Sequence, residues 1–155
     1  MEFLIGCNYW ASHAGIEMWA DWNKEQVEKD FIILKENGVN TLRMFINWRD
    51  FQPVETLYGP MSNVKGYVMK DLTEPKNPYY LDEKMLQHFN EFCDLAEKYD
   101  LKLIVGIVTG WMSGRLFVPT PLLDKNVYTD ATSLMFQEKF VRGFVCRFKH
   151  RSEIK

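Results

Sequence analysis

The sequence predicts an α/β fold in which short parallel strands alternate with helices. Three segments have the apolar, β-branched composition of buried strands, and three longer segments repeat apolar residues at helical spacing. The two kinds alternate along the 155 residues, and strands that are joined through a helix run parallel with right-handed connections. No repeat or linker interrupts this order, so we expect residues 1–155 to form a single domain.

Composition excludes several classes of function. The 19 basic and 21 acidic residues leave a formal charge of −2 without a basic run, so a nucleic-acid partner is not expected. No apolar stretch reaches membrane-spanning length, and residues 1–6 lack the basic start of a secretory signal. We therefore expect a cytoplasmic protein without membrane contact, unless a leader is removed ahead of Met1. The histidines and cysteines show no metal-ligand spacing, so neither a metal nor another cofactor is predicted.

The first strand is expected at residues 3–8, an apolar run that ends in polar and aromatic residues. A helix follows, because Asn23 has the character of an N-cap and Gln26 stands at the capping-box position. Gly38 supplies the C-terminal stop of this helix.

The second strand is expected at residues 40–47, because the segment between the stop at Gly38 and Pro53 is too short for another good helix and its β-branched and aromatic content favours a strand. Residues 49–80 are rich in proline, glycine and asparagine and show no sustained periodicity, so they predict a long loop. Loops of this length inside a compact domain tend to be functional.

Two helices and one strand complete the pattern. Asp82 can cap a helix, residues 102–108 form the third expected strand, and a loop over residues 110–128 leads to a last helix. This last helix starts at Asp130 or Ser133 and ends at Lys149. Its apolar stripe is aromatic and comprises Phe136, Phe140, Phe144 and Phe148.

Amide and indole side chains gather after the predicted strands. Asn8 and Trp10 follow the first strand, Asn47 and Trp48 end the second, and Trp111 follows the third. Chemistry in parallel α/β folds sits at these carboxyl ends, both in doubly wound open sheets and in eight-stranded barrels. The first loop lacks the glycine pattern of a nucleotide site. Flat indole faces and amide groups suit sugars, whose C–H faces stack on aromatic rings.

The segment from Gly38 to Trp48 resembles the second strand of clan A glycoside hydrolases, especially the cellulases and mannanases of family 5. It carries their G-x-N-x-x-R-x-x-x-x-W pattern, and the segment from Gly6 to Trp10 is similar to their first strand. Residues 128–130 are similar to their approach to the third helix, so the resemblance covers nearly the whole chain. It implies part of a TIM (β/α)8 barrel, with about three βα units and a fourth strand beginning near Ile154.

The resemblance implies retaining hydrolysis of β-linked glucan-type or mannan-type sugars. Such enzymes use an acid/base Glu after strand four and a nucleophile Glu after strand seven. Both positions lie beyond the residues of this chain, so we expect it to be inactive alone. By resemblance, Arg43 would hydrogen-bond the nucleophile and keep it ionised.

The tryptophans have two interpretations each. Trp10, Trp48 and Trp111 are either sugar contacts or large core plugs, because tryptophan is highly buried on average. Trp19 and Trp22 precede the first helix in a loop, where they either form an outer subsite or anchor the loop.

The polar candidates also have two interpretations. Asn8 and Asn47 either donate to sugar hydroxyls or satisfy the backbone of turns. The carboxylates nearest the strand ends, Glu17, Asp50 and Glu55, are expected to be solvated loop charges, since general catalysis needs a positioned pair.

Two other classes of function stay open beside an oligo- or polysaccharide-cleaving enzyme: a carbohydrate-binding protein without catalysis, and a small α/β domain with an unrelated ligand. Three barrel strands alone leave open edges and an uncovered apolar face, and the phenylalanine stripe needs neighbours. We therefore expect self-association, association with the missing half-barrel, or folding of the loop at residues 49–80 over the gap.

Overall fold

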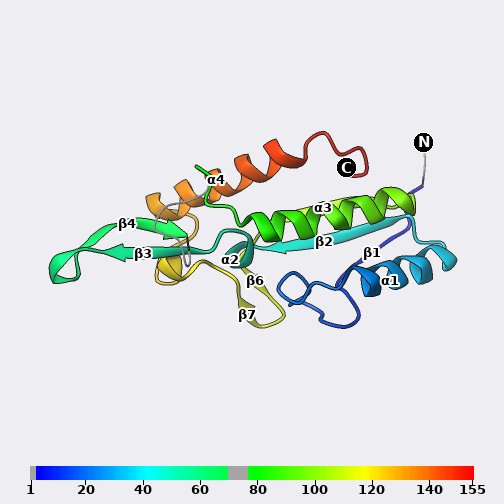
Figure 1. The fold of residues 1–155 in the computed structure, drawn as a ribbon, viewed down its shortest axis with the longest axis horizontal. Coiled ribbons are helices and arrows are strands. Elements are labelled where there is room, and N and C mark those ends of the chain that lie inside the picture. Colours follow the sequence, from blue (N-terminus) through cyan, green and yellow to red (C-terminus); the bar gives the residue numbers. More distant parts are fainter. Residues whose placement is uncertain (1–2, 70–76) are drawn as a thin grey trace. The chain divides into compact units, whose positions relative to one another are not determined.

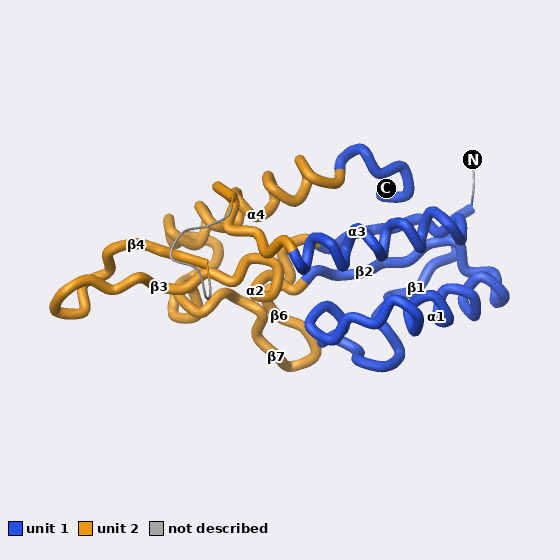
Figure 2. Tube along the Cα trace, in the orientation of Figure 1, with its two compact units in different colours: residues 1–46, 84–106, 149–155 blue, residues 47–83, 107–148 orange. Residues whose placement is uncertain are grey.

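The structure is a computed structural model that describes residues 3–69 and 77–155 (Figure 1). Contacts between Cα atoms divide the chain into two compact units (Figure 2). Unit one comprises residues 1–46, 84–106 and 149–155, and unit two comprises residues 47–83 and 107–148. The single domain expected from the sequence stays a prediction.

A three-stranded parallel sheet organises the fold. Its order is β1 (Gly6–Asn8), β2 (Thr41–Asn47) and β5 (Lys102–Thr109). The register of β1 on β2 places Gly6 beside Thr41 and Asn8 beside Arg43. This confirms the predicted parallel α/β arrangement with adjacent strands. The strand β1 is shorter than expected, because the Ile5 amide donates to the Asn40 side chain and not to the neighbouring strand backbone.

Helices α1 (Lys24–Glu36) and α3 (Glu83–Lys98) follow the expected positions. The Asn23 Oδ1 accepts from the Gln26 amide at 3.0 Å, which is the predicted N-cap. Gly38 has a φ of +79°, the left-handed conformation that ends many helices. The core of unit one is aromatic: Phe31 and Phe92 meet edge to face at 5.1 Å, and Tyr9 contacts both rings.

The last residues of the chain begin to pair with the far edge of β5. Ile154 bridges Leu103 in parallel, the Leu103 amide donates to the Glu153 carbonyl at 2.8 Å, and the Lys155 amide donates to the Leu103 carbonyl at 2.9 Å. Arg151 holds this segment against α3 through a 2.6 Å ion pair with Asp94. A strand position therefore starts near Ile154, as the sequence predicts.

In unit two, the expected long loop at residues 49–80 is wrong for much of its length. It contains the short helix α2 (Trp48–Phe51) and an antiparallel hairpin of β3 (Val54–Tyr58) and β4 (Val64–Met69), with the 3-10 turn η1 (Pro60–Ser62) between the strands. Pro53, Gly59 and Pro60 lie outside both strands, and Gly66 within β4 still pairs with Leu57, so these residues do not interrupt the pairing. Residues 70–76 of the predicted loop lie outside the described residues.

The expected loop at residues 110–128 also contains a hairpin, formed by β6 (Trp111–Met112) and β7 (Arg115–Leu116). Ser113 and Gly114 join the two strands, both with positive φ (50° and 77°). This is the backbone that two-residue hairpin turns require. The 3-10 turn η2 (Thr120–Leu122) follows.

The last helix is α4 (Ala131–Phe148), and the four phenylalanines of its stripe are buried. Phe136 packs edge to face on Tyr67 at 5.1 Å and on Tyr80 at 5.4 Å, while Phe144 packs on Phe51 at 6.3 Å. The segment at residues 49–80, predicted to be a loop, supplies Phe51, Tyr67 and Tyr80 as these neighbours. Its folding over the gap left by missing barrel strands stays a prediction.

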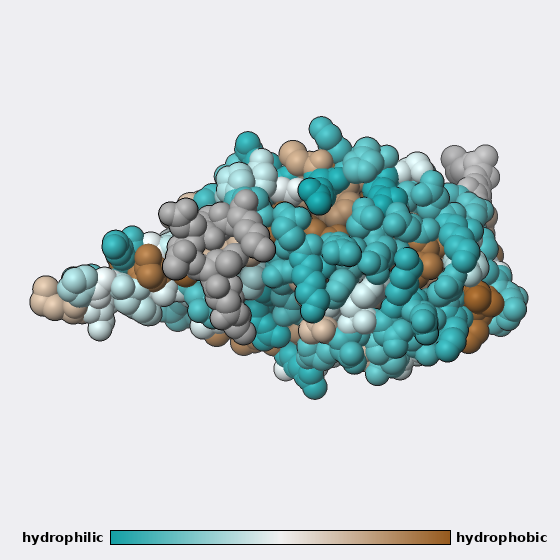
Figure 3. All heavy atoms as spheres, viewed as in Figure 1, coloured by the Kyte–Doolittle hydropathy of each residue, from teal (hydrophilic) through white to brown (hydrophobic). Residues whose placement is uncertain are grey.

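Some apolar surface stays exposed. The β3–β4 hairpin carries exposed Leu57, Met61 and Val64, and Figure 3 shows hydrophobic atoms on it. None of the helices in residues 3–69 and 77–155 combines the length and the apolar character needed to cross a membrane.

Replacing Gly143 tests the packing of α4. We expect Gly143→Ala to destabilise the protein by about 1–3 kcal/mol, although alanine is the better helix former, because its Cβ would lie 2.6 Å from the Tyr79 ring and 2.8 Å from Leu81. Denaturant unfolding measures the change, with Cys146→Ala at an exposed position of α4 as control. Equal or higher stability of Gly143→Ala would show that this contact does not restrict the helix.

Candidate functional site

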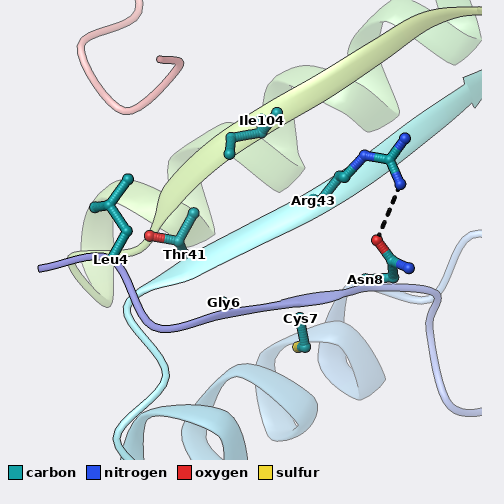
Figure 4. A pocket seen from close by; sticks show the side chains of 7 residues that line it. All are labelled: Leu4, Gly6, Cys7, Asn8, Thr41, Arg43 and Ile104. Carbon is teal, nitrogen blue, oxygen red and sulfur yellow. Dashed lines mark hydrogen bonds between the residues drawn. The ribbon is translucent and has the colours of Figure 1, made fainter.

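The inner face of the sheet in unit one carries the candidate site. Alternation along β2 sends Leu42, Met44 and Ile46 into the core, so Thr41, Arg43 and Phe45 share the other face. A shallow hollow of about 410 Å³ opens on this face (Figure 4). Its lining residues are Leu4, Gly6, Cys7, Asn8, Thr41, Arg43 and Ile104.

Arg43 is the charged group of this hollow, and it shares its face of β2 with Thr41 and Phe45. Its Nη1 donates to the Asn8 Oδ1 at 3.3 Å, as Figure 4 shows. Its guanidinium carbon lies 4.5 Å from the centre of the Phe45 ring. Among the described residues no carboxylate forms an ion pair with Arg43, and the side chain is exposed. Several of its five N–H donors are therefore open to a ligand or to another chain segment.

Trp10 joins the same face through Phe45. The two rings stack with centroids 5.7 Å apart and planes inclined by 22°. Gly106 of β5 makes room for this arrangement, since a Cβ there would lie 2.7 Å from the Phe45 ring. Trp10 is half-buried, which leaves part of its indole accessible. The inner face thus combines an indole, an amide and a guanidinium, the groups that recognise sugar faces and hydroxyls.

Behind this face, Asp30 of α1 is a buried carboxylate that the sequence analysis did not single out. Its Oδ2 accepts from the Tyr9 hydroxyl at 3.0 Å and from the Ser12 amide at 2.9 Å. Its Oδ1 accepts from the Ser12 hydroxyl at 2.7 Å and from Gln26 Nε2 at 3.2 Å. An Asp beside the apolar helix positions Val27 and Phe31 was the available signal, because a charge on a buried face requires partners.

These contacts change two ionisation equilibria. Burial by itself would raise the pKa of Asp30, but the hydrogen bonds from Ser12, Gln26 and Tyr9 outweigh it and hold the pKa below its ordinary value. Burial, and then the Asp30 charge, raise the pKa of Tyr9 far above its ordinary value. Tyr9 is therefore a protonated donor and Asp30 a charged acceptor at neutral pH.

Trp19 and Trp22 form an aromatic layer in unit one. Trp19 is completely buried, and its Nε1 donates to the Phe45 carbonyl at 2.8 Å. Trp22 stacks between Trp19 and His88 and donates to Glu91 at 2.9 Å. For Trp19 the packing agrees with the anchoring interpretation, because a ring without accessible surface does not touch a ligand in this structure. An outer subsite at Trp22 stays a prediction.

Unit two holds the other candidates. Trp48 is 1% exposed and donates to Gln52 at 2.7 Å, which agrees with the core-plug interpretation. Asn47 is buried and donates to Asp50 at 3.0 Å. Trp111 is 64% exposed on β6, so its ring is accessible for stacking.

The three carboxylates near the strand ends differ in surroundings. Asp50 accepts from Asn47 and from Arg49, Glu55 is exposed on β3, and Glu17 lies half-buried in the loop before α1. Across residues 3–69 and 77–155, no group of three or more His, Cys, Asp or Glu side chains is arranged to hold a metal ion.

Comparison with solved structures identifies several similar folds. An exo-β-1,4-mannosidase from Opitutaceae bacterium strain TAV5 is 24% identical over 97% of this chain and 23% of its own, with a TM-score of 0.77. A GH5_18 protein from Bifidobacterium longum subsp. longum ATCC 55813, in complex with Manβ1-4GlcNAc, is 20% identical over 99% of this chain and 32% of its own, with a TM-score of 0.78. An endo-1,4-β-mannanase from Rhizomucor miehei is 15% identical over 90% of this chain and 36% of its own, with a TM-score of 0.53. No protein-family model and no curated protein matches the sequence.

These likenesses show the fold. The chain has the fold of part of a TIM barrel, as the resemblance in the sequence implies. It spans between 23% and 36% of the length of the three solved chains. At an identity below 25%, the similarity concerns the fold and not the activity or the substrate.

The Asp30 carboxylate should make stability depend on pH. Because its pKa is lowered in the folded state, its contribution is complete above the unfolded-state pKa of about 4 and is lost as the pH falls through the folded-state pKa. We expect Asp30→Asn to cost about 1–3 kcal/mol at pH 7, and this difference from the unmodified chain should shrink at acid pH. Denaturant unfolding at a series of pH values measures it.

Asp124→Asn, at an exposed position, is the matched control and should change little at any pH. A stability difference for Asp30→Asn that stays constant down to the acid limit would contradict the assignment.

Proposed function

We propose that this chain forms part of a retaining glycoside hydrolase that acts on β-linked mannan-type or glucan-type sugars. The observation that carries the proposal is Arg43, exposed on the inner face of the parallel sheet beside Asn8 and Phe45. Arg43 is the charged residue of an otherwise apolar strand, and it presents open N–H donors on this face. The barrel fold of the similar structures supports the same reaction class.

The substrate class rests on the site and on the neighbours together. Trp10 offers an indole face that stacks on Phe45, and Asn8 and Arg43 offer hydrogen-bond groups in the hollow on the same face of the sheet. The similar structures are an exo-β-1,4-mannosidase, an endo-1,4-β-mannanase and a GH5_18 protein in complex with Manβ1-4GlcNAc. We therefore place β-1,4-linked mannosides first among the substrates.

Retaining hydrolysis requires two carboxyl groups about 5 Å apart, one as nucleophile and one as acid/base. We propose that both come from barrel strands that are not among the residues of this chain. In that arrangement Arg43 donates to the nucleophile carboxylate and favours its charged form. The residues of this chain would then supply the sugar contacts and the electrostatic support of the nucleophile. Catalysis would need the strands that carry the two carboxyl groups.

A carbohydrate-binding protein without catalysis is the second candidate. It is favoured by the lining of the hollow, whose residues include a guanidinium and an amide but no carboxylate.

Sugar binding tests the proposal. We expect β-1,4-mannobiose to bind the chain and Trp10→Ala to weaken this binding roughly 3–10-fold, the loss of one aromatic contact worth about 0.5–1.5 kcal/mol. Isothermal titration measures the affinity. Tyr128→Ala removes an exposed aromatic ring of unit two and should leave binding unchanged.

The same samples separate the two candidates. The chain alone should not hydrolyse an aryl β-mannoside, and the addition of the remaining barrel strands should restore turnover. Turnover by the chain alone that is abolished by changing Glu17, Asp50 or Glu55 would contradict the assignment of the carboxylates. If mannobiose does not bind, or if Trp10→Ala leaves its affinity unchanged, the assignment of this face as a sugar-binding site is contradicted.

The uncovered inner face should also drive association. β1 and β5 are the outer strands of the sheet, and Leu4 (47% exposed) and Ile104 (41% exposed) place apolar surface beside the hollow. We propose that the chain self-associates through this face when the other strands are absent. Sedimentation should show oligomers that Ile104→Lys weakens and that Ile33→Lys, on an exposed position of α1, does not. A monomer at high concentration would refute this.

A further inference from the structure

We propose that Asp30 is a positioning residue that fixes Asn8 and Trp10 on the inner face, an inference that rests on the proposed function. Asp30 belongs to α1, and in Figure 4 Cys7 points toward this helix while Asn8 and Arg43 point away from it. The carboxylate is buried, so it acts on the hollow only through other residues.

Asp30 accepts hydrogen bonds from residues on both sides of Trp10 in the sequence. Tyr9 precedes Trp10 and donates its hydroxyl to Oδ2 at 3.0 Å. Ser12 follows two residues later and donates its amide to Oδ2 at 2.9 Å and its hydroxyl to Oδ1 at 2.7 Å. The two residues between these attachment points, Trp10 and Ala11, are therefore held by one carboxylate.

A second set of contacts completes the restraint. The Tyr9 amide donates to the Arg43 carbonyl at 2.8 Å, which extends the pairing of β1 with β2 beyond Asn8. The Tyr9 ring also packs on Phe31 and Phe92. Because successive side chains of an extended segment point to opposite faces, fixing Tyr9 toward the helices directs Asn8 and Trp10 to the inner face, where Trp10 stacks on Phe45.

The ionised carboxylate is the group that this arrangement requires. Four donors converge on its two oxygens, and a carboxylate only accepts. An asparagine has the same shape, but its NH₂ group would replace one acceptor oxygen and face either the Ser12 amide or Gln26 Nε2, which can only donate, while the hydroxyl on that side would have to turn and accept. The contacts of the segment from Tyr9 to Ser12 then rearrange, and we expect Trp10 to shift on the Phe45 ring.

The test compares two substitutions on the same helix. Asp30→Asn removes the charge, and Val27→Ala trims a buried side chain one turn away without touching Tyr9 or Ser12 hydrogen bonds. The readout is the indole N–H resonance of Trp10 in the ¹⁵N-labelled chain, assigned with Trp10→Phe. We expect Asp30→Asn to shift this resonance and to weaken β-1,4-mannobiose binding, while Val27→Ala lowers the unfolding midpoint and leaves both unchanged.

Two milder variants cover the case in which Asp30→Asn does not fold. Tyr9→Phe and Ser12→Ala each delete one hydroxyl donor to the carboxylate, and each should shift the Trp10 resonance in the same direction by a smaller amount. An unmoved Trp10 resonance in Asp30→Asn, or an equal shift in Val27→Ala, overturns the inference.

The two proposals fail separately. If the unmodified chain does not bind mannobiose but the Trp10 resonance moves only in Asp30→Asn, the proposed function falls and the positioning role stands. If mannobiose binds and the resonance ignores Asp30→Asn, the positioning role falls and the proposed function stands.

Discussion

The register of β1 on β2 is the constraint on which the candidate site depends. It sets Asn8 beside Arg43 and Gly6 beside Thr41, so that an amide and a guanidinium meet on one face. A Cβ at Gly6 would lie 2.9 Å from the Thr41 carbonyl, which makes glycine the residue that permits this approach. A shift of this register by one residue would place the Arg43 and Asn8 side chains on opposite faces of the sheet, because strand side chains alternate.

One face of the sheet contributes to stability, and the other carries the candidate site. One face packs Leu42, Met44 and Ile46 against aromatic helices, and this apolar burial stabilises unit one. The other face keeps Arg43 and part of Trp10 accessible. The position of Trp10 on it is restrained by contacts that Tyr9 and Ser12 make on the opposite side of the sheet. Asp30 links the two faces, since a charge inside the stabilising layer holds the loop that presents Trp10.

Unit two shows how a long connection becomes structured when it has an apolar surface to cover. The phenylalanine stripe of α4 has no exposed member, because Phe51, Tyr67 and Tyr80 pack on it from the segment between β2 and α3. Gly143 gives the space that Tyr79 and Leu81 occupy. The β3–β4 hairpin is a two-stranded sheet, which is marginal in water by itself, and Tyr67 of β4 attaches it to this stripe.

The sequence by itself determined the features that depend on near neighbours, namely the Asn23 cap of α1 and the stop at Gly38. It also predicted parallel strands, because strands joined through a helix run parallel. Local periodicity and capping carry that information without tertiary contacts. Only the tertiary structure decided that Trp48 is buried while Trp111 is exposed, and that the predicted loop contains a hairpin. The same holds for Asp30, whose partners Tyr9 and Ser12 lie 21 and 18 residues away in sequence. Burial and long-range hydrogen bonds depend on which segments meet in space, and no local pattern specifies that meeting.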